Sequence, residues 1–287
     1  MSKHYLALDI GGTKIYGALY NKEMTVLAEM KIPTESAQGK SAVLNNIIKI
    51  VQKLKTSETL SIGIAWAGFV DSKNGIIKQA PNIEGFLDFP LCDHIQKETG
   101  IPTFIGNDAR LFAYGESLSS PTPPIALLGI IIGTGVGGGL VINGDIFYGA
   151  HNFAGEVGHC TDGEDEIETL IAGPGITTYL QNYFEIQQLS DLDNHDFSSK
   201  EMREIIQPRI KILTRWLRNL CLALDPSEIV IGGGAGLYFW QHFEKEINIE
   251  LEHLLSQYPT TLKIRYSSLK NAGNLGAGYL AINSLRS

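Results

Sequence analysis

Residues 5–14 constrain the fold of this chain more than any other segment. They read Tyr-Leu-Ala-Leu-Asp-Ile-Gly-Gly-Thr-Lys: an apolar run, one acid, two glycines, a hydroxyl and a cation. The apolar run predicts a buried strand, and the glycines allow a tight turn that presents backbone N–H groups. Amides and an ammonium suit the oxygens of a polyphosphate, and the carboxylate suits the water shell of its Mg²⁺. For this segment alone, a glycine hairpin beside an incidental acid is the alternative. The candidate ligands are Asp9, Gly11, Gly12, Thr13 and Lys14.

Two further glycine-rich loops follow apolar strands. Gly133 to Gly139 separates two apolar runs, and Gly232 to Gly236 follows a third. Neither loop has the lysine and hydroxyl that close a P-loop, and neither has the spacing of the dinucleotide fingerprint. Three such loops spread over the chain indicate one nucleotide gripped from both sides. The candidate contacts in the later loops are Gly133, Thr134, Gly135, Gly233 and Gly234.

Composition limits the class of protein. The chain has 287 residues, 44% of them hydrophobic and 19% charged, which predicts a packed core. Its net charge of −8 argues against binding to nucleic acid, which favours a basic face. Three scattered cysteines form no disulfide framework and favour a reducing, cytoplasmic location. We expect no signal peptide and no membrane span, because the start passes directly into the first strand and no apolar stretch is long enough.

Hydrophobic periodicity predicts an α/β chain in two halves. Both halves begin with a strand, a glycine loop and a second strand, which indicates a duplicated α/β domain with ligands in the cleft between the copies. The Pro-rich segment 119–124 marks the boundary. The expected strands are 5–9, a meander over 15–32, 60–65, 102–105, 125–132, 139–143 and 229–231; the expected helices are 40–55, 109–118, 167–185, 208–224 and 273–285.

The motifs resemble those of the ROK family of sugar kinases and repressors, within the actin-like ATPase superfamily. Residues 9–14 match its first phosphate motif, Gly133 to Gly139 its second, and Gly232 to Gly236 its adenosine motif, in the right order over essentially the whole chain. The resemblance implies two actin-like (ribonuclease H-like) α/β domains with an interdomain cleft. It implies a sugar and phosphate lobe over residues 1–120 with the last helix of 273–287, and a nucleotide and oligomerisation lobe over 121–272. We expect ATP and Mg²⁺ as cofactors and a homodimer.

Asp108 is the candidate general base for phosphoryl transfer. It follows the apolar strand that ends at Gly106, and a helix is expected to begin after it. On local grounds an Asp before Ala109 is a typical helix N-cap. The resemblance instead implies that Asp108 takes the proton of the sugar hydroxyl and that Asn107 is a sugar ligand.

Further sugar ligands follow from the resemblance. Glu156 and His159 match its Gly-Glu-x-Gly-His motif, and Glu168 matches a later glutamate. Taken alone, the first two could be ordinary loop residues. The resemblance implies that Gly68, Pro81 and Asn82 line the other wall of the sugar pocket. On local grounds the segments around Gly68 and around Pro81 could equally be two ordinary turns after strands.

The segment after His159 departs from the family pattern. Many members hold a structural Zn²⁺ there with the histidine and three cysteines. This chain has His159-Cys160 followed by a short acidic loop. Adjacent His and Cys residues cannot close a tetrahedral site, so we predict no zinc site. We expect His159 to be free to face the sugar, on a loop that lacks its metal staple.

Several functions remain open from the sequence. The first is an ATP-dependent hexose kinase resembling glucokinase. N-acetylglucosamine, N-acetylmannosamine, fructose and β-glucosides are alternative substrates within the family, because discrimination depends on pocket shape. A repressor or sugar sensor without catalysis is the alternative of a different class. The acidic chain and the four residues before the first strand argue against the repressor.

Overall fold

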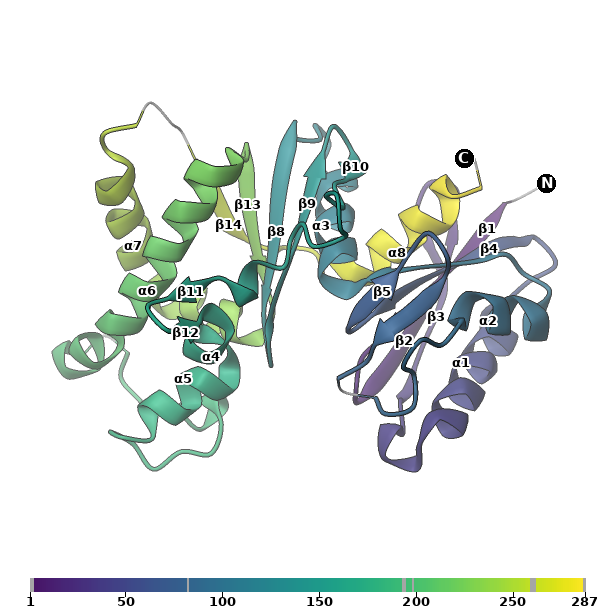
Figure 1. The fold of residues 1–287 in the computed structure, drawn as a ribbon, viewed down its shortest axis with the longest axis horizontal. Helices are drawn as coiled ribbons and strands as arrows, with labels where there is room; N and C mark the ends of the chain where they lie inside the picture. The colour runs from purple at the N-terminus through teal and green to yellow at the C-terminus, as the bar shows by residue number, and fades with distance from the viewer. Residues whose placement is uncertain (1–2, 82, 193–194, 198, 259–261, 286–287) are drawn as a thin grey trace. The chain divides into compact units, whose positions relative to one another are not determined.

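The computed structural model describes residues 3–81, 83–192, 195–197, 199–258 and 262–285. The chain separates into two compact units (Figure 1). Unit 1 comprises Met1–Pro123 and Leu269–Ser287, and unit 2 comprises Pro124–Ser268. Among the described residues, the helices are too short or too polar to cross a membrane.

Unit 1 is built on a five-stranded sheet of order β3-β2-β1-β4-β7. β1 to β3 form an antiparallel meander, whereas β4 and β7 run parallel to β1. The sheet strands are β1 His4–Ile10, β2 Lys14–Asn21, β3 Val26–Pro33, β4 Thr59–Trp66 and β7 Thr103–Asn107, with a separate small sheet of β5 Phe69–Asp71 and β6 Ile76–Gln79. The helices are α1 Lys40–Leu54, α2 Leu91–Thr99, α3 Asp108–Leu118 and α8 Ala272–Asn283, with a 3₁₀ turn η1 at Ser36–Gln38.

The two faces of this sheet differ in side-chain size, and that difference decides which helices cover them. Leu6, Leu8 and Ile10 alternate along β1, and on one face of the sheet they pack with residues of α1 and α2 in an apolar cluster. The opposite face carries small residues: Ala7 pairs with Gly63 of β4, and a Cβ atom on Gly63 would lie 1.9 Å from the Ala277 carbonyl oxygen of α8. The backbone of α8 therefore approaches the sheet closely.

Unit 2 repeats this topology with a sheet of order β10-β9-β8-β13-β14. Its first hairpin is antiparallel, and β13 and β14 are parallel to β8. The strands are β8 Ala126–Ile132, β9 Val136–Ile142, β10 Asp145–Ile146, β11 Thr161–Asp162, β12 Asp165–Glu166, β13 Glu228–Gly232 and β14 Lys263–Tyr266. The helices are α4 Ile167–Ile171, α5 Gly173–Leu180, α6 Lys200–Leu224 and α7 Gly234–Leu255, with 3₁₀ turns η2 Val157–His159 and η3 Leu189–Leu192.

Two predicted helices are corrected by the structure. The helix expected over 167–185 is two helices, α4 and α5, because Ala172 is extended before Gly173 and Pro174 start a new helix. The helix expected to start at Pro208 begins at Lys200, where the Ser199 hydroxyl caps the Met202 N–H, so this proline lies inside α6. The sequence analysis also missed two helices, α2 and α7, and the strands β5, β6, β10, β11, β12 and β14.

The other expected elements are present, with ends shifted by a few residues. One local turn follows its sequence signal closely. Asn143 and Gly144, between β9 and β10, both have positive φ, at 52° and 84°. These are the angles that a two-residue hairpin turn of type I′ requires, and Asn-Gly is its preferred sequence.

Candidate active site

The first group of candidate residues lies at the carboxyl ends of three parallel strands in unit 1. Ile10 of β1 pairs with Trp66 of β4, and Trp66 pairs with Asn107 of β7. Asp9, Gly68 and Asp108 therefore occupy the same edge of one sheet. In parallel sheets this edge is where ligands bind.

Asn107 organises this edge. Its Oδ1 accepts from the Arg110 N–H at 3.0 Å, so Asn107, and not Asp108, is the N-cap of α3. Its Nδ2 donates to the Gly68 carbonyl oxygen at 3.1 Å and to Asp108 Oδ1 at 3.1 Å. Both amide protons are then used, and Oδ1 keeps one lone pair as an acceptor for a hydroxyl. The helix-cap alternative for Asp108 is thus wrong.

Asp108 is the first residue of α3, and its Oδ1 also accepts from the Ala109 N–H at 2.9 Å. These two hydrogen bonds fix the carboxylate at the strand-to-helix corner. Nearby, a Cβ atom on Gly273 at the start of α8 would lie 3.8 Å from both Asp9 Oδ2 and the Asp108 carbonyl oxygen. The start of α8 therefore lies close to both acidic residues.

The turn at Gly68 packs closely against the segment that follows β6. Gly68 has φ 138°, and a Cβ atom there would lie 2.4 Å from the Gln79 carbonyl oxygen and 3.3 Å from Ala80 Cα. Any other residue at Gly68 would therefore be strained and would clash. The structure thus brings the turn at Gly68 against the segment just before Pro81. Asn82, predicted beside it, lies outside the described residues.

The first glycine loop is held from behind by two hydroxyls that the sequence analysis did not single out. Thr34 Oγ1 donates to the Gly11 carbonyl oxygen at 2.6 Å, and Ser36 Oγ donates to the Gly12 carbonyl oxygen at 2.8 Å. The Gly11 N–H donates to the Lys14 carbonyl oxygen, so Gly11 forms the turn itself. Thr13 and Lys14 are exposed.

Asp9 is the half-buried acid of this edge. Burial raises the pKa of its carboxyl group, and the positive charge of Lys14 acts in the opposite direction. A further cation near Asp9 would favour its ionised form in the same way as Lys14 does. Among the residues described, no cluster of three or more His, Cys, Asp or Glu side chains could hold a metal ion by itself.

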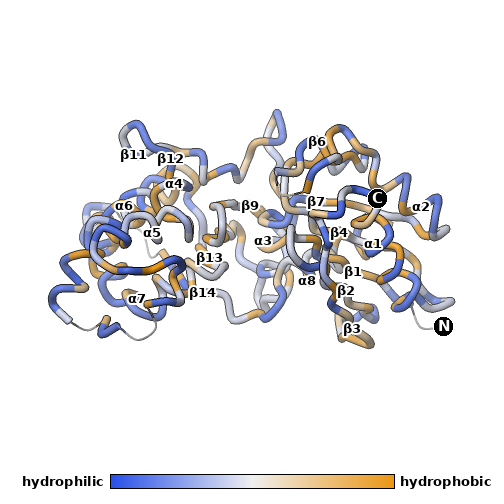
Figure 2. Tube along the Cα trace, turned by 90° about the horizontal axis from the view of Figure 1, so that it is seen from below, coloured by the Kyte–Doolittle hydropathy of each residue, from blue (hydrophilic) through white to orange (hydrophobic). Residues whose placement is uncertain are grey.

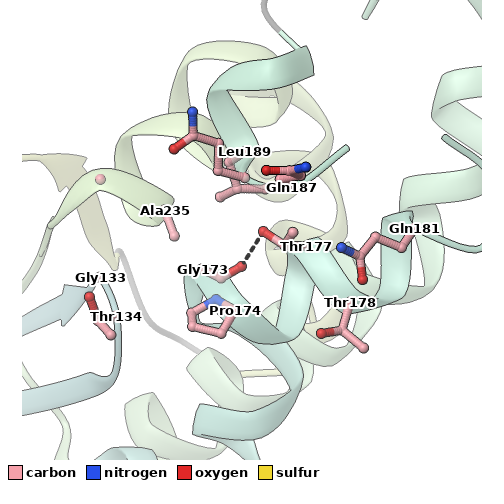
Figure 3. Close-up of a pocket in the computed structure, with 12 residues that line it drawn as sticks. Gly133, Thr134, Gly173, Pro174, Thr177, Thr178, Gln181, Gln187, Leu189 and Ala235 are labelled. Carbon is pink, nitrogen blue, oxygen red and sulfur yellow. Dashed lines mark hydrogen bonds between the residues drawn. The ribbon is translucent and has the colours of Figure 1, made fainter. Parts of the chain in front are cut away.

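The second and third glycine loops meet in unit 2 around a pocket of about 580 Å³ (Figure 3). Its glycine end contains the predicted residues Gly133, Thr134 and Gly234. The predicted Gly233 caps α7 at φ 84°, and a Cβ atom there would lie 2.4 Å from the Ile132 carbonyl oxygen. The N-terminus of α7 therefore opens directly beside the loop, which favours an anionic ligand.

The other end of the pocket was not predicted. α5 and the segment that follows it supply neutral polar groups, because Gly173 and Pro174 turn the chain and the Gly173 N–H donates to the Gly133 carbonyl oxygen at 2.8 Å. The sequence signal was the Gly-Pro-Gly interruption, hidden by the expectation of one long helix. The remaining lining residues are Gly173, Pro174, Thr177, Thr178, Gln181, Gln187, Gln188, Leu189 and Ala235.

Glu156, His159 and Glu168 lie together around the short β11–β12 hairpin of unit 2. Gly155 has φ 97°, and a Cβ atom there would lie 2.6 Å from the Gly138 carbonyl oxygen, so this segment packs directly on β9. Glu168 Oε2 accepts from the Val136 N–H at 2.8 Å, at the end of the second glycine loop.

His159 has a carboxylate partner, Glu166, that the sequence analysis did not predict. Its Nδ1 lies 3.0 Å from Glu166 Oε2, and this hydrogen bond is the main reason why the pKa of His159 is raised. The charges of Glu166, Glu168 and Glu156 act in the same direction, against a lowering by burial. The other ring nitrogen, Nε2, is not part of this contact.

The sequence profile of the ROK family matches residues 5–284. A glucokinase of Halalkalibacterium halodurans is 30% identical, over 96% of this chain and 94% of that protein. The chain belongs to the ROK family. An N-acetylmannosamine kinase of Citrobacter koseri, another similar protein, is 27% identical over 96% of this chain and 98% of its own length.

Solved ROK structures share the fold. The ROK hexokinase from Thermus thermophilus superposes with a TM-score of 0.85, covering 99% of both chains at 24% identity. A ROK family glucokinase from Streptomyces griseus, in complex with glucose and AMPPNP, superposes with a TM-score of 0.77 at 23% identity, covering 98% of this chain and 99% of that chain. The predicted actin-like pair of α/β domains is thus confirmed as the fold of this ROK family member.

Proposed function

We propose that this ROK protein is an ATP-dependent sugar kinase that transfers the γ-phosphoryl group of ATP to a hexose hydroxyl. The observation that carries the proposal is the register of β1, β4 and β7. In this register the half-buried Asp9 of β1 and the fixed carboxylate of Asp108, just after β7, lie at the same edge of the sheet, with β4 between the two strands. A phosphoryl-transfer enzyme needs charge neutralisation and a base in such a place.

Asp108 acts as the general base in this proposal. As the sugar oxygen forms its bond to the γ-phosphorus, the bond from that phosphorus to the β–γ bridging oxygen breaks. The hydroxyl proton passes to the Asp108 carboxylate, and ADP leaves. Asn107 and the Ala109 N–H hold Oδ1 of this carboxylate, which keeps the base at the strand-to-helix corner.

The 580 Å³ pocket of unit 2 is the proposed ATP site. Its volume lies in the range of small-molecule sites. Gly133, Thr134 and Gly135 with Gly233 and Gly234 would take the phosphates through backbone N–H groups and the dipole of α7. The glutamine and threonine side chains at the far end would meet the base. AMPPNP in the Streptomyces griseus glucokinase is consistent with a nucleotide in a related site.

Mg²⁺ is the proposed metal, held by Asp9 through water together with the ATP phosphates. A single carboxylate fits this mode, because Mg²⁺ in kinase sites keeps several waters and relies on phosphate oxygens. The metal would neutralise phosphate charge. Gly12, Thr13 and Lys14 would contact the phosphates, with Gly11 forming the turn.

The kinase relatives act, by name, on glucose and on N-acetylmannosamine. We place glucose first and an N-acetylhexosamine second, since the glucokinase is the more similar of the two. The proposed sugar ligands are Gly68, Pro81, Asn82, Asn107, Asp108, Glu156, His159 and Glu168.

We also propose a cytoplasmic homodimer. The free Cys160 thiol is exposed, which suits a reducing compartment. Light scattering on a sizing column tests the dimer. We keep the domain division at residue 120 and near 272 as a proposal, and limited proteolysis at the Pro-rich segment 119–124 tests the first boundary.

Phosphorus NMR of a reaction mixture tests the activity itself. Protein, ATP, Mg²⁺ and glucose should yield ADP and a sugar monophosphate signal. An N-acetylhexosamine in place of glucose tests the second substrate. Formation of ADP with inorganic phosphate alone would indicate an ATPase and would contradict the proposal.

A further inference from the structure

Two neighbouring residues of α6 hold the segment that carries the proposed sugar ligands. Trp216 is buried, and its Nε1 donates to the Val157 carbonyl oxygen at 3.1 Å. Arg215 is half-exposed, and its Nη2 lies 2.6 Å from Asp162 Oδ2. Val157 lies between Glu156 and His159, and Asp162 lies three residues after His159. The helix α6 thus contacts this segment at two points, Val157 and Asp162.

The β11–β12 hairpin connects these contacts to the ligands. The Ile167 N–H donates to the Cys160 carbonyl oxygen at 2.8 Å, which closes the hairpin at its base. Thr161 pairs with Glu166, whose carboxylate binds His159. A shift of Asp162 is therefore carried to His159 through the strand pair and to Glu168 through Ile167.

The hairpin needs a positive partner. Five of the seven residues from Asp162 to Glu168 are acidic, and Figure 2 shows this segment as hydrophilic. Like charges at this density repel one another. The guanidinium of Arg215 lies against the first of these acids, where it offsets the repulsion and fixes the direction of the strand.

We propose that Arg215, together with Trp216, is a positioning residue that holds His159 and Glu168 for the sugar through Asp162. The proposal rests on the proposed function, because it assigns the sugar to these ligands. Arg215 does not act on the reacting atoms. Arg215 instead fixes the position of the loop from α6. In this loop only one cysteine, Cys160, lies beside His159.

Arg218 offers a matched control. It lies on the same helix about one turn later, and its guanidinium donates to Asn219 Oδ1 and to the Tyr258 hydroxyl oxygen. Arg215→Ala and Arg218→Ala each remove one positive charge from α6. Only the first releases Asp162. Arg215→Lys keeps the charge but loses the guanidinium geometry and should restore part of the effect.

The main measurement is the affinity of the sugar by calorimetry without ATP. We expect Arg215→Ala and Asp162→Ala each to weaken sugar binding roughly two- to fivefold, in the range of a partly exposed ion pair. The double variant should be no weaker than the single ones, because both remove the same contact. Arg218→Ala should stay within about twofold of the wild type.

Equal sugar affinity in Arg215→Ala and Arg218→Ala would overturn the proposal, as would effects of Arg215→Ala and Asp162→Ala that add in full. Absence of sugar binding in the wild type across a panel would instead contradict the proposed function. In that case amide hydrogen exchange over residues 160–167 tests whether Arg215 holds the hairpin in place. Exchange should be faster in Arg215→Ala than in Arg218→Ala, and equal rates would overturn the mechanical role.

Discussion

The carboxylate of Glu168 accepts a hydrogen bond from the backbone N–H of Val136 at 2.8 Å. This contact joins a proposed sugar ligand to the end of the second glycine loop, at the proposed phosphate site. A Cβ atom on Gly135 would lie 2.5 Å from the same oxygen, so this loop position must be a glycine for the contact to form.

Glu168 should therefore affect both substrates, in a separable way. Glu168→Gln keeps an acceptor for Val136, so it should weaken sugar binding and leave the KM for ATP nearly unchanged. Glu168→Ala removes the acceptor as well and should also raise the KM for ATP, by about fivefold for a hydrogen bond worth about 1 kcal/mol. Steady-state kinetics with each substrate varied measures both values. Identical ATP kinetics in the two variants would show that the contact does not order the loop.

Asp108→Asn should separate catalysis from folding. The amide keeps an oxygen for the Ala109 N–H, so α3 should be preserved, but it cannot accept the sugar proton. We expect kcat to fall by roughly 10²–10⁴-fold, with sugar affinity within a few fold of the wild type. Asp93→Asn, on the exposed side of α2 in the same unit, is the control and should leave kcat unchanged. Turnover of Asp108→Asn within a few fold of the wild type would rule out the base.

The pKa of His159 should be raised above its ordinary 6.5, because Glu166 favours the charged ring. Glu166→Gln should lower it. By linkage, the pair adds stability that is complete below the unfolded pKa and is lost as pH rises through the folded pKa. The gain is small, since both side chains are about half-exposed. Histidine ring NMR titrations of the wild type and of Glu166→Gln measure this shift, with His159→Gln assigning the signal. Superimposed titration curves would contradict the hydrogen bond.

The protein should need Mg²⁺ and no zinc. Cys92 and Cys221 are buried, and burial raises the pKa of the Cys92 thiol to about 12, which keeps it protonated and poor as a metal ligand. Elemental analysis of protein purified without chelator should give substoichiometric zinc, and a zinc chelator should leave the melting temperature unchanged. Activity should depend on added Mg²⁺. One tightly held zinc per chain would mean that the 159–168 loop is misinterpreted.

The strands and the glycine loops were predictable because their signals are local. An apolar run followed by glycines, as around Asp9 and before Gly233, is recognisable from a few adjacent residues. The long apolar periodicity of α6 was also visible, but its start was not, because an internal proline resembles a helix beginning. The break at Ala172 was missed because the apolar residues on both sides keep helical spacing.

The acidic residues of the candidate site were predictable from the sequence, but the residues that hold them in position were not. Asn107 was recognised as a ligand, yet its role as helix cap and as partner of Gly68 and Asp108 depends on strand register. Thr34, Ser36 and Arg215 lie far along the chain from the segments they hold. Such long-range contacts follow from packing, and no short pattern encodes them.

ADP release across a panel of sugars measures whether this protein transfers phosphoryl groups to a sugar. The panel should contain glucose, N-acetylglucosamine, N-acetylmannosamine, fructose and a β-glucoside, with ATP and Mg²⁺ held in excess. We predict low ADP release without sugar and a strong stimulation by one of these sugars, glucose first, that is lost in Asp108→Asn. ADP release that no sugar stimulates, or that persists unchanged in Asp108→Asn, would contradict the assignment as a sugar kinase with Asp108 as its base.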